Sequence, residues 1–221
     1  MIEILHKDKD FLVCVKPQGV SSQSDLSGEM DMTALLKNYL EEANENSDIF
    51  VVHRLDRATG GIVLYARNKV AAAVFSNLVA QKDGFEKQYL TVVSGMPESE
   101  SGSMSDLLFK DSAQKKSLVV KSERKGAKVA SLDYETVKTL KQGEKVFSLL
   151  QIKLNTGRFH QIRSQLASRG MPVYGDGKYG SREKAPHFAL WANKIIFTYK
   201  GKKYQFEKDP DFDTMPWNLF N

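Results

Sequence analysis

The chain has 221 residues, 41% hydrophobic and 27% charged, which allows a packed core and excludes a largely disordered chain. Its 32 lysines and arginines outnumber 27 acidic residues, a net charge of +5 that suits a polyanionic partner without requiring one. A single cysteine excludes an intrachain disulfide, and no segment approaches the roughly 20 apolar residues that cross a membrane. With no pattern of a secretion signal at the N-terminus, we expect a cytoplasmic protein whose Cys14 lies in the core.

The first half of the chain alternates apolar segments with helical patterns. Strands are expected at 11–16 and 61–66, a short apolar run at 49–52, and helices at 33–42 and 69–81. Thr33 can cap the first helix and Asn68 the second. In the second helix, Val70, Val74 and Leu78 are predicted to form the buried face because they share one side.

The second half is richer in strands. They are expected at 86–93, 117–121, 129–139, 146–154, 188–199 and 203–206, with a helix at 157–168 and an irregular excursion at 94–116. The strands follow one another without regular crossover helices. This order predicts an α+β fold with a mostly antiparallel mixed sheet and flanking helices, and a single domain over residues 1–221.

Residues 110–128 form a basic segment. They hold seven lysines and arginines but only two acidic side chains, Asp111 and Glu123. Such a segment is usually a solvated loop or hairpin. It is also a candidate patch for phosphate contacts, with Lys115, Lys116 and Lys121 as the proposed ligands.

A carboxylate between two arginines marks the first candidate site. Asp56 lies between Arg54 and Arg57, just before the pair Gly60-Gly61, which permits a tight turn. Nearby cations favour the ionised carboxylate, which can then act as a nucleophile or an electrostatic stabiliser. Taken alone, the motif fits an ordinary surface ion pair equally well.

The second candidate segment, 155–163, gathers hydrogen-bonding side chains at the expected start of a helix. Arg158, His160 and Arg163 lie there, and His160 and Arg163 are three residues apart, so a helix would place them on one face. Backbone donors at a helix start also favour anions. The alternative is a polar helix end with a structural histidine.

These segments, taken together, resemble the RluA-like family of RNA pseudouridine synthases. The matching pieces are Lys16-Pro17 with Gly19, His53-Arg54-Leu55-Asp56 with Thr59-Gly60-Gly61, Lys87-Gln88-Tyr89-Leu90, and Gly157-Arg158 with His160-Gln161-Ile162-Arg163, Gly175-Asp176 and Tyr179-Gly180. They occur in the family's order between residues 11 and 180. Gly60 and Trp191 depart from the family's frequent Ser and His, and neither change is expected to stop catalysis.

The resemblance implies a pseudouridine synthase catalytic domain, without the S4 domain of many relatives, that isomerises uridine to pseudouridine in ribosomal or transfer RNA. It implies that Asp56 is the essential carboxylate, with its role as sugar nucleophile, base nucleophile or proton acceptor left open. Arg163 is its implied guanidinium partner, and Tyr89 is implied to pack against the uracil and to serve in proton transfer at C5. No cofactor is implied, and the sequence shows no glycine fingerprint for a nucleotide and no zinc spacing.

The expected partner is RNA, bound by a protein that acts as a monomer without an obligate protein partner. The target base must leave its stack, which costs a few kcal/mol. Arg54 is the candidate to fill the vacated position. The other expected RNA-binding residues are Arg57, Arg158, His160, Lys115, Lys116 and Lys121.

Two rival functions are open at this point. A glycoside hydrolase also breaks a bond at an anomeric carbon, but it usually needs two carboxylates, and only Asp56 is a candidate. A non-catalytic RNA-binding module is the second rival. The presence of Asp56, Tyr89 and Arg163 argues against it.

Overall fold

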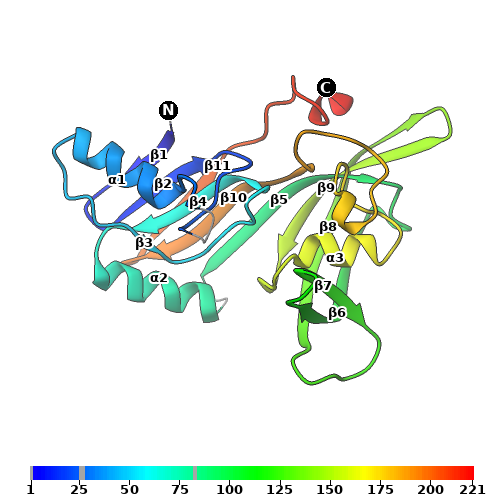
Figure 1. The fold of residues 1–221 in the computed structure, drawn as a ribbon, viewed down its shortest axis with the longest axis horizontal. Helices are drawn as coiled ribbons and strands as arrows, with labels where there is room; N and C mark the ends of the chain where they lie inside the picture. Colours follow the sequence, from blue (N-terminus) through cyan, green and yellow to red (C-terminus); the bar gives the residue numbers. More distant parts are fainter. Residues whose placement is uncertain (1, 25–27, 82–83) are drawn as a thin grey trace. The chain divides into compact units, whose positions relative to one another are not determined.

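The computed structural model describes residues 2–24, 28–81 and 84–221 (Figure 1). The chain forms two compact units, one from Met1–Lys87 and Ala192–Asp209, the other from Gln88–Trp191 and Pro210–Asn221. That the whole chain acts as one catalytic domain stays a prediction. None of the described helices is long and apolar enough to cross a membrane.

The first unit contains a sheet whose central strands are buried on both faces. Its strands are β1 (Glu3–Lys7), β2 (Phe11–Lys16), β3 (Phe50–Val51), β4 (Gly60–Ala66), β10 (Leu190–Tyr199, whose first two residues belong to the second unit) and β11 (Lys202–Glu207). The order is β1-β2-β4-β10-β11, and β3 pairs with β4. Every residue of β2 and β4 is buried, which explains their nearly continuous apolar sequences.

Helices α1 (Met32–Glu42) and α2 (Lys69–Gln81) belong to the same unit. Asp31, and not Thr33, caps α1, because its carboxylate accepts bonds from the amides of Thr33 and Ala34. Asn68 accepts from the amide of Ala71 at the start of α2, as expected of a cap.

The predicted buried face of α2 is wrong. Val70 is 73% exposed and Val74 is 40% exposed, whereas Ala71 and Phe75 are fully buried. Phe75 packs against Phe11 and Phe197, with ring centroids 5.4 Å from each. The Phe75 ring packs among the aromatic side chains of the sheet, and this contact decides which side of the helix faces the sheet.

The second unit contains an antiparallel sheet in the order β5-β9-β8-β6-β7 and one α-helix. Its elements are β5 (Phe85–Ser94, which begins in the first unit), β6 (Ser101–Asp111), β7 (Lys116–Val120), β8 (Lys128–Gln142), β9 (Lys145–Leu154), α3 (Gln161–Ala167) and two 3-10 helices, η1 (Gly177–Tyr179) and η2 (Trp217–Phe220). The α+β class with a mostly antiparallel sheet is therefore confirmed.

Two predictions about this unit are wrong. The expected excursion at 94–116 contains β6, an eleven-residue strand that pairs with both β7 and β8. The helix expected from Gly157 begins only at Gln161, because His160 adopts a left-handed conformation with a φ of 49°. Arg158 and Phe159 therefore precede the helix, and His160 does not share a helical face with Arg163.

Candidate active-site residues

Asp56 lies on an anchored turn between β3 and β4. The amide of Thr59 donates to the carbonyl of Asp56 at 2.9 Å, which closes the turn. On the preceding side, Leu55 is buried and exchanges two 3.1 Å hydrogen bonds with the hydroxyl of Ser22. Asp56 itself is half-buried. The backbone is thus held on both sides while the carboxylate keeps a partly accessible position.

His53 anchors the same segment further upstream. Its Nε2 accepts a 3.1 Å hydrogen bond from the amide of Leu64 in β4. Burial, aided by the charge of Lys87, lowers the pKa of His53 to about 3, so the ring is neutral at neutral pH. His53 is a structural residue of the turn.

Lys16, at the end of β2, is fully buried beside the turn. Its Nζ donates to the carbonyls of Pro17, Val20 and Arg57 at 3.0, 2.7 and 3.0 Å. An ammonium group has three donors, and all three find an acceptor here. The side chain therefore ties the loop after β2 to the Asp56 turn.

The Lys16 ammonium also interacts with the Asp56 carboxylate. Burial lowers the pKa of Lys16 to about 7, and the negative charge of Asp56 acts in the opposite direction. This attraction is mutual, so a charged Lys16 favours the ionised form of Asp56.

The pKa of Lys16 predicts a pH dependence of stability. In the unfolded chain the lysine holds its proton up to about pH 10.5, whereas in the folded chain it begins to lose it near pH 7. Between these values the unfolded state binds more protons, so the free energy of unfolding should rise with pH, by at most about 1.4 kcal/mol per unit from this group. Urea unfolding of the wild type and Lys16→Met at several pH values tests this.

From pH 7 to pH 9, the free energy of unfolding of the wild type should rise relative to that of Lys16→Met. Lys9→Met is the control, because Lys9 is exposed in the same unit and its removal should shift the curve equally at every pH. Parallel curves for the wild type and Lys16→Met would refute the assignment.

The two arginines that flank Asp56 differ in their contacts. Arg57 donates from Nε to the carbonyl of Gly19 at 2.8 Å and forms an ion pair with Glu29. Arg54 is exposed and has no hydrogen bond or ion pair with any described residue. Arg54 is therefore the arginine of the pair whose guanidinium is available to a ligand.

The structure shows why the second residue of the pair Gly60-Gly61 after the turn must be a glycine. Its φ is 113°, and a Cβ there would lie 2.2 Å from the carbonyl oxygen of Ala192. No other residue fits this close approach of β4 to β10.

In the second unit, Arg163 forms a bidentate ion pair with Asp176. Its Nε and an Nη donate to the two carboxylate oxygens at 2.6 and 2.9 Å, and the side chains are only 6% and 2% exposed. The guanidinium also lies over the rings of Tyr179, at 5.0 Å, and Phe188, at 4.3 Å. These contacts fix the plane and direction of the guanidinium.

His160 and Tyr179 form a hydrogen-bonded pair next to Arg163. The Tyr179 hydroxyl accepts from the amide of Ser117 at 2.7 Å and lies 3.0 Å from Nδ1 of His160. Burial, followed by the charges of Arg163 and Lys178, lowers the pKa of His160 to about 3. A neutral imidazole that accepts the tyrosine proton at Nδ1 fits this arrangement.

The other predicted site residues of this unit lie in different surroundings. Tyr89, on β5, is 6% exposed and pairs with Ile152 of β9. Arg158 is exposed and donates to the carbonyl of Val129 at 3.1 Å. Lys115 and Lys121 are exposed, as predicted of a basic surface, and Lys116 lies 6.0 Å from the Tyr179 ring.

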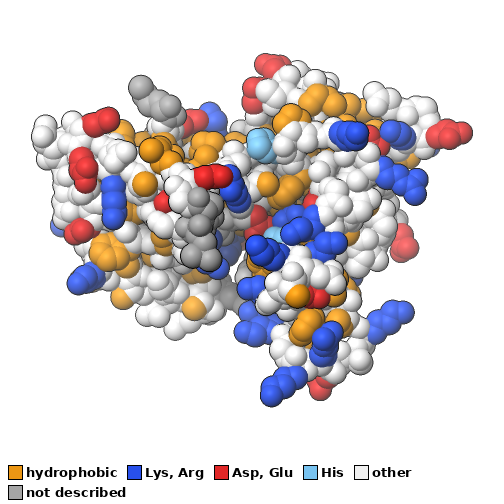
Figure 2. All heavy atoms as spheres, viewed as in Figure 1, with side chains coloured by type: hydrophobic (Ala, Val, Ile, Leu, Met, Phe, Trp, Pro, Cys, Tyr) orange, Lys and Arg blue, Asp and Glu red, His pale blue; other side chains and the backbone are white. Residues whose placement is uncertain are grey.

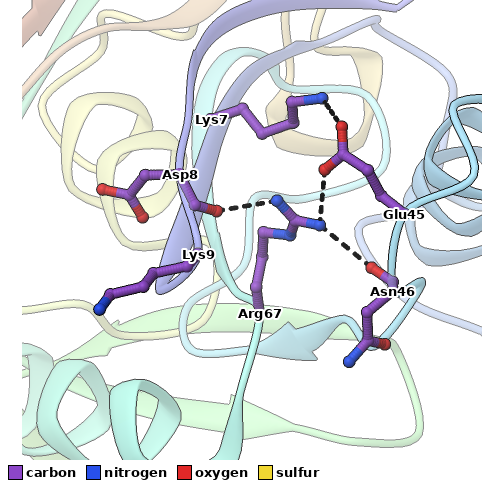
Figure 3. A pocket seen from close by; sticks show the side chains of 6 residues that line it. All are labelled: Lys7, Asp8, Lys9, Glu45, Asn46 and Arg67. Atoms are coloured by element: carbon purple, nitrogen blue, oxygen red, sulfur yellow. Dashed lines mark hydrogen bonds and ion pairs between the residues drawn. The ribbon is translucent and has the colours of Figure 1, made fainter.

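A separate polar pocket lies in the first unit (Figure 3). It has a volume of about 520 Å³ and does not include Asp56. Glu45 bridges Lys7 and Arg67, and Arg67 also donates to the carbonyls of Asp8 and Asn46 at 2.8 and 3.1 Å. The charged groups of the pocket thus bind one another, and they hold the loop after α1 to β1. Among the described residues no cluster of side chains could hold a metal ion.

Comparison with known proteins decides the family. The sequence model of the family described as RNA pseudouridylate synthase matches residues 10–168. The chain belongs to this family. Its members are isomerases that convert uridine to pseudouridine in RNA. The match contains Asp56, Tyr89 and Arg163, the three residues predicted to act in catalysis.

Individual relatives agree with this assignment. The chain is 29% identical over 209 residues to ribosomal large subunit pseudouridine synthase C of Rickettsia bellii, which covers 92% of this chain and 67% of the relative. It is 30% identical to an RNA pseudouridine synthase of Haemophilus influenzae, with 90% and 83% covered. It spans 63% of the Bacillus subtilis relative YhcT.

Solved structures agree on the fold. Human RNA pseudouridylate synthase domain containing 1 superposes with a TM-score of 0.81 at 21% identity, covering 96% of this chain and 84% of that one. Human RNA pseudouridylate synthase domain containing 4 gives a TM-score of 0.79 at 20% identity, covering 98% and 90%. The expected pseudouridine synthase fold and the RluA-like resemblance are confirmed.

Sequence reasoning assigned no role to Lys16 or Asp176, although both lie in the family-like segments. A lysine that ends the apolar run Phe11–Lys16 was the available signal for the first. For Asp176, nothing local indicated a partner thirteen residues upstream.

Proposed function

We propose that this pseudouridine synthase isomerises specific uridines in ribosomal or transfer RNA and that Asp56 is its essential carboxylate. The observation that carries the proposal is the half-buried Asp56, held on an anchored turn beside the Lys16 ammonium. That cation favours the charged carboxylate, which all three possible roles of Asp56 require.

The reaction breaks the bond between the sugar and N1 of uracil, turns the base, and joins the sugar to C5, so that C5 loses a proton and N1 gains one. Asp56 is proposed to assist as sugar nucleophile, base nucleophile or proton acceptor. Arg163 is proposed as the guanidinium that orients this carboxylate. Tyr89 is proposed to pack against the uracil. Asp176 would then act as a positioning residue, through its bidentate bond to Arg163.

Access to the base requires that the nucleotide leave its stack, and we propose that Arg54 occupies the vacated position. Its exposed and uncommitted guanidinium supports this role. The cost of extrusion, a few kcal/mol, is offset by phosphate contacts. We propose Arg57, Arg158, His160, Lys115, Lys116 and Lys121 as RNA-binding residues. The protein is expected to act in the cytoplasm as a monomer.

Tritium release from RNA labelled at C5 of uracil tests the proposal, because forming the new bond expels that hydrogen. The purified chain should release tritium from ribosomal or transfer RNA and leave pseudouridine at the same positions. RNA binding without release would favour a non-catalytic module, and free uracil would favour a hydrolase.

The basic segment provides a second prediction. The triple variant Lys115→Ala, Lys116→Ala, Lys121→Ala should bind RNA more weakly and lower the slope of log affinity against log salt by about 2, since each lost phosphate contact removes about 0.7–0.9. Filter binding at several salt concentrations measures this.

The control removes three exposed lysines outside the segment, Lys37, Lys141 and Lys203, and should leave the slope near that of the wild type. Equal slopes in the wild type and the first triple variant would remove these lysines from the interface.

A further inference from the structure

The three strands β6, β7 and β8 have one covered and one uncovered face. On the covered face, Gln165 of α3 donates to the carbonyl of Ala130, and Ser164 of α3 donates to that of Ser117. Met104, Leu108 and Ala130 are buried on this side. Because side chains alternate along a strand, the residues between them face the opposite side.

The uncovered face is apolar where β6 pairs with β7 and with the start of β8. Cross-strand pairs place Phe109 beside Leu118, and Leu107 between Val120 and Val129. Leu118 is 37% exposed and Val129 is 57% exposed, so both are open to solvent. A contiguous apolar surface near the edge of a sheet is typical of an interaction surface.

Cations surround this face. The Arg124 guanidinium lies 3.7 Å from the ring centroid of Phe109, in stacking contact. Exposed lysines that have no ion pair with any described residue occupy the β6–β7 turn and the β7–β8 connection; they are Lys115, Lys121 and Lys125. Figure 2 shows basic and apolar side chains interspersed over the part of the molecule that holds β6 and β7.

We propose that this face binds an unpaired stretch of the RNA substrate, outside the nucleotide that reacts. Aromatic rings and guanidinium planes stack on bases, and lysines contact phosphates. A paired helix would hide the flat faces of its bases and use only the lysines. The Phe109–Arg124 stack with its apolar neighbours therefore fits a single strand. This inference rests on the proposed function, since it assumes an RNA substrate.

Two exposed valines of β8 provide a matched test. Val129 lies on the proposed surface, whereas Val137, 55% exposed, lies farther along the same strand. Val129→Asp and Val137→Asp make the same change in charge at similar exposure. The probe is a short labelled strand of adenine and cytosine only, alone or annealed to its complement, with affinity followed by fluorescence anisotropy.

Val129→Asp should weaken binding of the unpaired strand by roughly tenfold, the effect of losing about one stacked base and adding repulsion. Arg124→Ala should weaken it similarly. Val137→Asp should keep an affinity for the single strand within about twofold of that of the wild type. The affinities of the three variants for the duplex should differ from one another much less than their affinities for the single strand. Equal affinities of Val129→Asp and Val137→Asp, or equal losses on strand and duplex, would overturn the proposal.

Tritium release from the same preparations separates the two proposals. If the wild type releases tritium but the two valine variants bind alike, only the surface assignment fails. If no preparation releases tritium, the proposed function fails whatever the binding data show. Binding of an acidic peptide provides a further comparison. If Val129→Asp weakened binding of the peptide but left the RNA affinity unchanged, the face would be assigned to an acidic protein and the RNA proposal would be overturned.

Discussion

Asp56→Asn should reduce tritium release from C5-labelled RNA by about 10⁴-fold or more, the size of loss seen when an essential catalytic group is removed. Asparagine keeps the shape of the side chain, and the backbone bonds that close the turn do not depend on the carboxylate. What is lost is the negative charge beside Lys16. An amide can neither attack carbon nor accept a proton at neutral pH, so all three possible roles predict the same loss.

RNA affinity measured on the same variant makes the result specific. It should stay equal to that of the wild type or rise slightly, because a negative charge has been removed from an RNA-binding protein. Asp48→Asn, at an exposed loop position, is the matched control and should keep full activity. If Asp56→Asn retained more than a tenth of wild-type activity, the essential carboxylate would have to be sought elsewhere.

Local signals predicted the elements whose burial follows from their own sequence. β2 was predicted with the bounds Phe11–Lys16 because its apolar run ends at Pro17, and the end of α2 was predicted from its pattern. β6 was missed because Ser101–Asp111 contains serines, a glycine and two aspartates, which have weak strand propensity. Its pairing with both β7 and β8 overrides that preference.

The candidate site likewise combines residues that the local sequence predicted with contacts that it did not predict. The Asp56 turn was located by its neighbours in sequence, with Gly60 and Gly61 directly following. One of the three backbone carbonyls that accept hydrogen bonds from Lys16 belongs to Arg57, forty-one residues away. No sequence pattern predicts that bond. The late start of α3 depends on the left-handed backbone of His160, a conformation that few residues other than glycine adopt.

Asp176→Asn should lower the free energy of unfolding by about 3 kcal/mol, because the buried Arg163 guanidinium loses the carboxylate that accepts two of its hydrogen bonds. Arg163 and Asp176 are 6% and 2% exposed, so water cannot replace the lost carboxylate. The contacts with the rings of Tyr179 and Phe188 remain, and they offset only part of the loss. Urea unfolding followed by circular dichroism measures the change.

Glu183→Gln is the control within the same unit. Its ion-pair partner, Lys145, is 63% exposed, so this loss should stay below about 1 kcal/mol. The double variant Arg163→Met, Asp176→Asn adds a second check. The double variant buries neither charge of this ion pair, so it should be more stable than Asp176→Asn alone. If it were less stable, the ring contacts of Arg163 would outweigh its charge, and Asp176 would not be the group that makes this buried cation tolerable.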